Sequence, residues 1–190
     1  MKDKIIALVD FDLPLLYESS GNPVGGTAIE WSNWISGLNG LGVQVDLISR
    51  LGATQMLPEY SGLVLEAYDE SAGLPYLKNI FHRLPRLISA LRRTEATYVF
   101  QQNAGLLTGL SALACRITGK KFVYRVGSDI DASKAAKKKL GLLKYVIFRL
   151  ALRQAHLILC QNNFQLGELR KTFGNHRIEK IYNPIALKTN

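Results

Sequence analysis

Cysteine is scarce in this sequence: Cys115 and Cys160 are the two cysteines among 190 residues. They lie far apart among apolar residues and form no CxxC pair, so we expect two buried, reduced thiols and neither disulfides nor a metal site. No apolar run reaches the roughly 18 residues that a transmembrane helix needs. The first apolar run ends at Asp10, which makes it too short for a signal-peptide core. We therefore expect a cytoplasmic protein.

Negative charge is missing from one long stretch. Residues 132–167 contain no aspartate or glutamate, whereas the whole chain has a formal net charge of +9. Such an excess of positive charge favours an anionic partner, which could be a phosphorylated ligand, an anionic membrane surface or nucleic acid. Aromatic residues are not interleaved with the basic run in a stacking pattern, and no RNA-binding signature is present. We therefore expect no nucleic-acid partner.

Short apolar runs with strand character alternate with segments of helical periodicity along the whole chain. Strands are predicted at residues 5–9, 43–49, 63–68, 97–101, 121–126, 156–160 and 178–182. Helices are predicted at residues 27–41, 77–93, 105–118, 134–155 and 164–173. Pro85 should kink or split the second of these helices. This alternation predicts one α/β domain over residues 1–190, with a Rossmann-like parallel sheet flanked by helices on both faces.

The loop after the first predicted strand contains Gly25-Gly26. In open parallel sheets ligands bind at the carboxyl ends of the strands, and a glycine pair lets the backbone approach a phosphate beside free helix N–H groups. Thr27 and Glu30 form a T-x-x-E capping box, which predicts the start of the following helix. The alternative is a flexible loop with an ordinary cap. The loop lacks the GxGxxG pattern and no acidic residue follows the second strand, which argues against a nicotinamide-dependent enzyme.

At this point the sequence resembles the family 4 glycosyltransferases, which have the GT-B fold. The resemblance is carried by Gly25-Gly26, by Trp34, Ile35, Leu38 and Gly42, and by the stretches 122–129, 155–161 and 181–185. Each motif is weak alone, but their order and spacing cover nearly the whole chain. The sequence departs from the family where Ala28 replaces a glutamate and Val43 replaces a histidine.

The resemblance implies the N-terminal, acceptor-side domain of a retaining glycosyltransferase. Its substrates would be a nucleotide sugar and a saccharide or lipid-linked acceptor of polysaccharide or glycolipid biosynthesis. The Lys/Arg pair and the E-x7-E motif that hold the donor belong to a second domain, which is absent from residues 1–190. Since the resemblance implies a transfer that generally needs no metal, we expect neither a cofactor nor a metal ion. Because the donor-binding residues lie in the other domain, we expect no turnover by this domain alone.

The resemblance also implies the site residues. Gly25, Gly26 and Thr27 would lie beside the donor diphosphate. The family's histidine in the cleft aligns with Val126, which cannot donate a hydrogen bond, so the histidine is dispensable here or a neighbour takes part of its role. The other candidates are polar residues at or after strand ends: Gln102, Asn103, Arg125, Ser128, Asp129, Asp131, Gln161 and Asn162. Turn formation and helix capping are the alternative roles for these residues.

A basic amphipathic segment at residues 134–155 suits an anionic bilayer surface. Its candidate membrane-binding residues are Lys134, Lys137, Lys138, Lys139, Lys144 and Arg149. The alternative is that its apolar side packs on the sheet while its lysines are merely solvated. Residues 77–93 form a weaker segment of the same kind. For the whole chain, the second hypothesis is a non-catalytic Rossmann-like module attracted to an anionic membrane or to nucleic acid.

Overall fold

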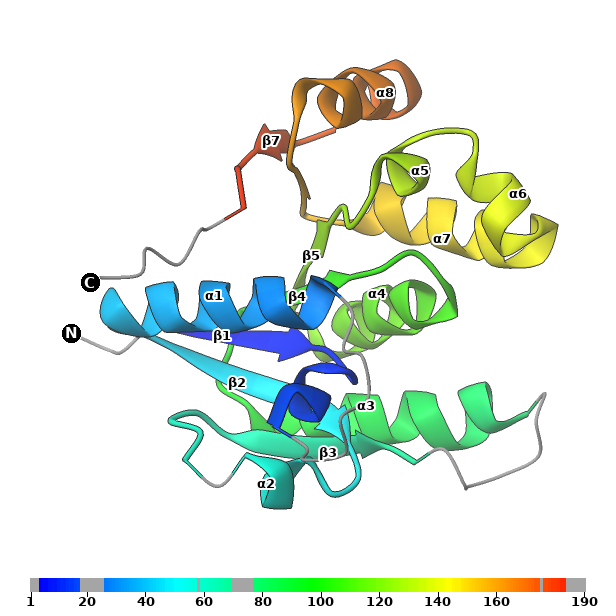
Figure 1. The fold of residues 1–190 in the computed structure, drawn as a ribbon. Coiled ribbons are helices and arrows are strands. Elements are labelled where there is room, and N and C mark those ends of the chain that lie inside the picture. Colours follow the sequence, from blue (N-terminus) through cyan, green and yellow to red (C-terminus); the bar gives the residue numbers. More distant parts are fainter. Residues whose placement is uncertain (1–3, 18–25, 58, 70–76, 175, 184–190) are drawn as a thin grey trace.

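The computed structural model describes residues 4–17, 26–57, 59–69, 77–174 and 176–183. Seven strands of this part of the chain form one parallel sheet in the order β3-β2-β1-β4-β5-β6-β7 (Figure 1). The strands are β1 (Lys4–Val9), β2 (Val43–Arg50), β3 (Val64–Tyr68), β4 (Tyr98–Gln102), β5 (Lys121–Arg125), β6 (Leu157–Cys160) and β7 (Ile178–Lys180). The predicted α/β class and every predicted strand are confirmed.

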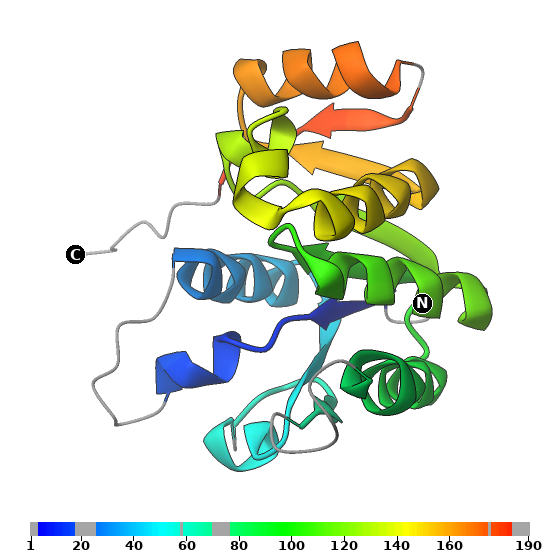
Figure 2. The same cartoon turned by 90° about the vertical axis from the view of Figure 1, so that its right-hand side faces the viewer.

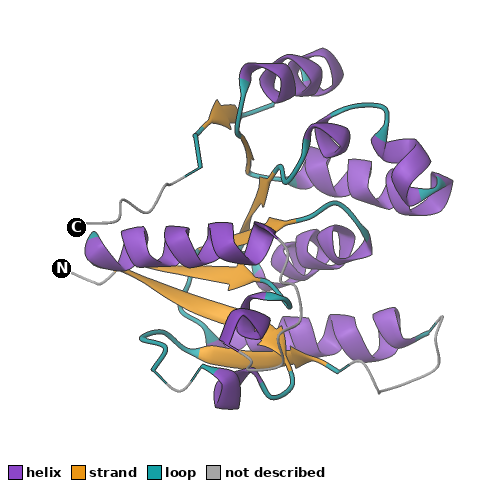
Figure 3. Ribbon diagram, in the orientation of Figure 1, coloured by secondary structure: helices purple, strands orange, loops and turns teal. Residues whose placement is uncertain are grey.

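Helices connect the strands and cover both faces of the sheet. They are η1 (Leu13–Tyr17), α1 (Gly26–Gly40), α2 (Ala53–Met56), η2 (Asn79–Arg83), α3 (Leu84–Arg93), α4 (Leu106–Thr118), α5 (Asp129–Ala132), α6 (Ala136–Leu140), α7 (Leu142–Gln154) and α8 (Asn163–Phe173). Figure 2 shows α1 and η1 on one side of the sheet and α3, α4 and α7 on the other. Figure 3 shows the alternation of helix and strand that defines this doubly covered sheet.

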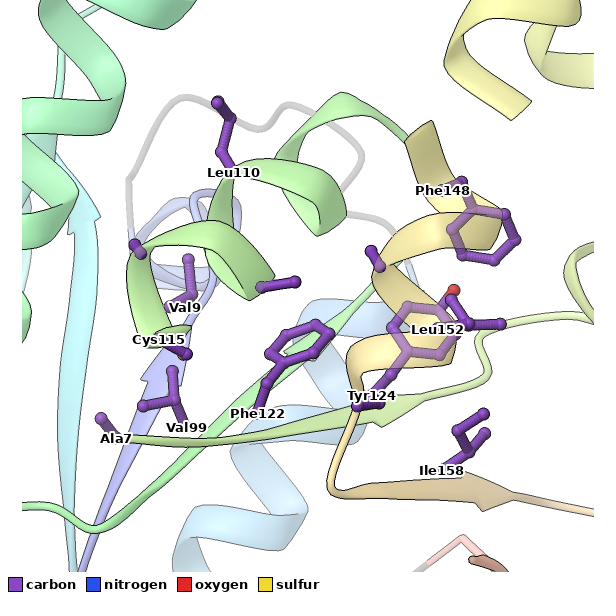
Figure 4. Close-up of a cluster of buried hydrophobic side chains, with 14 of the residues drawn as sticks. Ala7, Val9, Val99, Leu110, Cys115, Phe122, Tyr124, Phe148, Leu152 and Ile158 are labelled. Carbon is purple, nitrogen blue, oxygen red and sulfur yellow. The ribbon is translucent and has the colours of Figure 1, made fainter. Parts of the chain in front are cut away.

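Each face of the sheet has its own apolar core, because successive residues of a strand point to opposite faces. In β1, Ala7 and Val9 face the core under α3, α4 and α7, whereas Leu8 faces the core under α1. Figure 4 shows the larger core, in which Phe122 and Tyr124 of β5 lie near Phe148 of α7.

The structure corrects one helix prediction, confirms another and adds short elements that periodicity does not reveal. The helix predicted at residues 134–155 is two helices, α6 and α7, because Gly141 lies between them with a φ of 76° that interrupts the helical backbone. Pro85 does split its segment: a π-helical turn, η2, gives way to α3 next to it. The short elements η1, α2 and α5 were not predicted.

Candidate functional site

The order in which the chain adds strands reverses at β1. The strands β2 and β3 lie on one side of β1, and the chain then crosses to β4 on its other side. In such sheets ligands bind in the crevice at the carboxyl ends of the strands. A cavity of about 480 Å³ lies at this edge, beside the N-terminus of α1. It is lined by Gly26, Thr27, Ile29, Glu30, Asn33, Gln102, Gly127, Gln161 and Asn183. We call it the amide-lined cavity.

Glu30 is the acid of this cavity. Helix α1 already includes Gly26, so Thr27 lies inside the helix and the predicted capping box at Thr27 and Glu30 is wrong. The Glu30 carboxylate instead accepts hydrogen bonds from Gln102 Nε2, at 3.1 Å, and from Arg125 Nε. Its charge is therefore held at the edge of the cavity by partners on β4 and β5, and not by the backbone of its own helix.

Arg125, at the end of β5, is fully buried and does not line the cavity. Its guanidinium pairs with Glu30 and donates from Nη2 to Asn183 Oδ1, and it lies 5.0 Å from the centre of the Trp34 ring. A buried charge is tolerated only when it is paired. Arg125 thus acts through Glu30 and Asn183, two cavity residues from distant parts of the sequence, and fixes their positions.

Asp129 and Asn162 come together from neighbouring strand ends. Asp129 Oδ1 accepts hydrogen bonds from Asn162 Nδ2, at 3.0 Å, and from Gln165 Nε2, at 2.9 Å. These two bonds lower the pKa of the Asp129 carboxyl below its usual range. Asn162 also caps α8, because its Oδ1 accepts from the backbone N–H of Gln165. Asn162 therefore has the helix-capping role that was its alternative, and it also contacts Asp129 at the neighbouring strand end.

Some of the other predicted residues lie at the amide-lined cavity, and others do not. Gln161 lines the cavity and donates from Nε2 to the Val126 carbonyl at 2.8 Å, while Asn103 Oδ1 accepts from the Thr27 hydroxyl at 3.1 Å. Val126, by contrast, is fully buried in the larger core. Gly25 lies outside the described residues.

Asp131 is not among the residues that line the amide-lined cavity. Its side chain is buried, and its carboxylate pairs with Lys139 at 3.0 Å, so it ties α5 to α6. The hydroxyl of Ser128 is buried and has no hydrogen-bond partner among the described residues. Ser128 precedes α5 as its N-cap residue, but its side chain makes no capping hydrogen bond there.

A second, smaller cavity of about 270 Å³ lies at the carboxyl ends of β1 and β4. Asp10 is buried beside it, and burial raises the pKa of its carboxyl to about 6. Asp10 Oδ1 accepts from the backbone N–H groups of Asp12, at 2.9 Å, and Leu13, at 2.7 Å, and so caps η1. Sequence reasoning treated Asp10 only as the end of an apolar run.

Sequence reasoning also missed Asn33 and Asn183, and it assigned Glu30 to a cap. One signal was available for Glu30. An arginine inside the apolar run Phe122–Val126 needs a buried acidic partner, and that partner had to come from an element that passes the end of β5. Nothing in the sequence marks Asn33, because an asparagine within a helix is usually solvated.

The predicted membrane-binding residues are not equivalent in the structure. Lys134, Lys137, Lys138 and Lys144 are exposed, whereas Lys139 pairs with Asp131. Arg149 lies over the Phe173 ring, at 4.2 Å from its centre. Within the described ranges, no helix is long and apolar enough to cross a bilayer. Nor does this part of the chain gather three or more histidine, cysteine or acidic side chains into a group that could hold a metal ion.

Comparison with protein families gives one match that covers most of the chain. The family model described as Glycosyltransferase Family 4 matches residues 24–189. The match includes α1, the polar strand ends and the amide-lined cavity. No curated protein sequence matches the chain at a significant level.

Solved structures share the fold at low sequence identity. MurG of Acinetobacter baumannii is 13% identical with a TM-score of 0.60, over 98% of this chain and 47% of MurG. A sucrose-phosphate synthase structure from Thermosynechococcus elongatus is 12% identical with a TM-score of 0.53, over 97% of this chain and 91% of that one. The UDP-GlcNAc 2-epimerase of Neisseria meningitidis, solved with UDP-GlcNAc bound, is 11% identical with a TM-score of 0.58, over 88% and 42%. The chain thus spans about half the length of MurG, as expected of one GT-B domain.

Proposed function

The chain belongs to glycosyltransferase family 4, and we propose that it is the acceptor-side half of a retaining glycosyltransferase. In this proposal a second domain binds most of the nucleotide-sugar donor and closes over the amide-lined cavity. The acceptor is a saccharide or a lipid-linked saccharide of polysaccharide or glycolipid synthesis. The UDP-GlcNAc bound to the structurally similar epimerase supports a nucleotide sugar as the donor.

One observation carries the proposal: the amide-lined cavity is polar but lacks a cation. Its residues offer amide and hydroxyl groups and one carboxylate, and none of those that the structure describes is lysine, arginine or histidine. The N-terminus of α1 supplies a positive dipole end. A donor diphosphate needs more positive charge than this, since two phosphates carry at least two negative charges. A partner domain that supplies those cations makes the site complete.

The protein is further proposed to work in the cytoplasm, on the inner face of a membrane. Exposed leucines and lysines share one helix there: Leu142 and Leu143 are 65% and 74% exposed at the start of α7, next to Lys144. A lipid-linked acceptor would reach the carboxyl edge of the sheet from such a surface. Apolar side chains bordered by lysines fit an anionic bilayer better than open solvent.

The enzymatic proposal is tested by sugar transfer. Radiolabelled UDP, GDP, ADP and dTDP sugars are offered with a membrane extract to residues 1–190 and to the longest protein that the reading frame through Asn190 encodes. We expect transfer by the longer protein and none by residues 1–190. Glu30→Gln should lower the transfer rate by about tenfold or more, because a charged hydrogen bond at the cavity is lost. Glu95→Gln, at an exposed site before β4, is the matched control.

Two results would contradict the proposal. One is a reading frame that stops at Asn190 together with no transfer in the presence of any partner protein from the same cells. The other is a longer protein that transfers sugar equally well with glutamate or glutamine at position 30. Binding to membranes without transfer would favour the non-catalytic module.

A further inference from the structure

A large cavity lies away from the amide-lined cavity, on the other flank of α1. It has a volume of about 640 Å³, within the range of small-molecule sites. Its walls come from η1, from α1, and from α2 and the chain that leads to β3. In Figure 1, the short elements η1 and α2 lie below α1, next to β2 and β3.

Helix α1 separates the two cavities. At about 100° per residue, Glu30 and Ser32 lie on opposite sides of the helix axis. Glu30 lines the amide-lined cavity, whereas Ser32 lines the large one, and none of the described residues lines both. A ligand in the large cavity would therefore leave the transfer site open.

The floor of the large cavity is apolar and consists of buried side chains. Leu13, Ile35 and Leu57 line it and are 1%, 8% and 7% exposed, because they belong to the core between α1 and the sheet. Tyr60 also lines it, but the Tyr60 hydroxyl is buried, so the hydroxyl is not the part of this side chain that a ligand reaches. The packing of these residues does not depend on a ligand, so the hollow is preformed.

The rim of the cavity is polar, and the groups that α1 contributes to it are neutral. Ser32, Ser36 and Asn39 follow one another along α1, and Asn39 Nδ2 donates to Ser61 Oγ at 3.1 Å across the cavity edge. Tyr17 adds a ring that is 57% exposed. Hydroxyl and amide groups around an apolar, aromatic floor suit a sugar, which has hydroxyl edges and apolar ring faces.

The charges of the residues that line the large cavity indicate a ligand without negative charge. The chain has a net charge of +9, yet none of the described residues that line this cavity is cationic, and Glu59 is acidic. A phosphate, a nucleotide or an anionic glycan would meet no positive partner and one negative charge. The cavity therefore selects against the anionic ligands that the rest of the surface attracts.

We propose that this cavity binds a neutral oligosaccharide and holds a glycan chain on the flank of α1 opposite the transfer site. The glycan would lie against Tyr17 and Tyr60, and its hydroxyl groups would exchange hydrogen bonds with the serines and the asparagine of α1. The binding step itself requires neither the nucleotide sugar nor the second domain. This binding activity goes beyond the proposed transfer activity, and it can be measured with residues 1–190 alone.

The test is binding of neutral tetrasaccharides to the ¹⁵N-labelled chain. Maltotetraose, cellotetraose and chitotetraose are titrated separately, and the backbone amide signals are followed by NMR. For at least one of the three we expect shifts at Ser32, Ser36, Asn39 and Ser61. Ser36→Phe fills the cavity from an exposed helical position and should weaken binding roughly tenfold or more, which is about 1.4 kcal/mol. Tyr17→Ala should weaken it as well.

Matched variants separate this inference from the transfer proposal. Thr27→Phe blocks the amide-lined cavity and should leave tetrasaccharide binding unchanged, whereas Ser36→Ala keeps the large cavity open and should also bind. If the parent chain binds a tetrasaccharide and the longer protein does not transfer sugar, the transfer proposal is contradicted and the binding inference stands. Shifts confined to the amide-lined cavity, no shifts with any of the three glycans, or equal binding by Ser36→Phe would overturn the inference.

Discussion

Asp10 is the residue whose surroundings most clearly couple stability to pH. Burial raises the pKa of its carboxyl from 3.8 to about 6, although the N–H groups of Leu13 and Asp12 and the charge of Arg50 act in the opposite direction. The folded protein thus holds this proton more tightly than the unfolded chain does. The stability that Asp10 contributes is therefore full at low pH and is lost as the pH rises from 3.8 to about 6.

We predict that Asp10→Asn stabilises the protein at pH 7.5, because asparagine keeps the oxygen that caps η1 and carries no buried charge. The gain should be about 1–3 kcal/mol, and most of it should vanish at pH 4.5. Urea unfolding at the two pH values measures it. Asp12→Asn, at an exposed position, is the control and should show a much smaller difference. An equal effect of Asp10→Asn at both pH values would show that the buried charge is not the cause.

The candidate site was predictable at the level of strand ends but not of side-chain partners. Gln102 and Gln161 do line one cavity, because the carboxyl ends of parallel strands meet at one edge. The pairing of Arg125 with Glu30 was predictable only in part. An arginine in an apolar strand requires an acidic partner, but this ion pair joins residues 95 positions apart and depends on how α1 crosses the sheet. Local patterns such as T-x-x-E carry no information on such a crossing.

At the scale of elements, strands were easier to predict than helices. Most of the strands are short apolar runs that the sheet largely buries, so composition reveals them, although β7 has an exposed glutamate, Glu179. Helix ends depend on single residues: Gly141 divides the basic segment although apolar residues continue on both sides of it. The break turns α6 away from α7 and lets Lys139 reach Asp131.

Helices α4 and α7 approach each other closely at Gly109. A Cβ atom there would lie 2.3 Å from Ile147 Cγ2, so a side chain forces one of the helices to move. We predict that Gly109→Ala destabilises the protein by about 1–3 kcal/mol, although alanine favours helix by about 1 kcal/mol over glycine. Thermal and urea unfolding measure the loss, and Ile147→Ala added to Gly109→Ala should recover part of it.

Gly167 of α8 provides the matched control for this prediction. It also lies inside a helix, but a Cβ atom there would meet nothing within 4 Å. Gly167→Ala should therefore stabilise the protein slightly through helix propensity. A Gly109→Ala variant that is as stable as Gly167→Ala would mean that α4 and α7 are not held at this contact.

For the whole molecule, the arrangement of layers decides which exposed apolar side chains share one side of the sheet. Helices α3, α4 and α7 lie on one side of the sheet (Figure 2), and α4 and α7 leave apolar side chains exposed there. These side chains are Leu113, Ile117, Leu142, Leu143, Val146 and Leu150. The lysines at positions 134, 137, 138 and 144 are exposed as well. Helix α4 packs against α7, so the exposed apolar side chains of the two helices belong to one side of the molecule.

We predict that the chain co-sediments with vesicles that contain phosphatidylglycerol and phosphatidylcholine, and that added salt weakens this binding by screening the lysines. Lys137→Gln with Lys138→Gln should weaken it about thirtyfold, since each lysine near an anionic surface contributes about 1 kcal/mol. Leu143→Ser should weaken it through lost apolar contact, whereas Leu41→Ser, at an 81% exposed leucine just beyond the end of α1, should not. Equal binding to pure phosphatidylcholine vesicles, or no binding at low salt, would show that this basic apolar surface has another purpose.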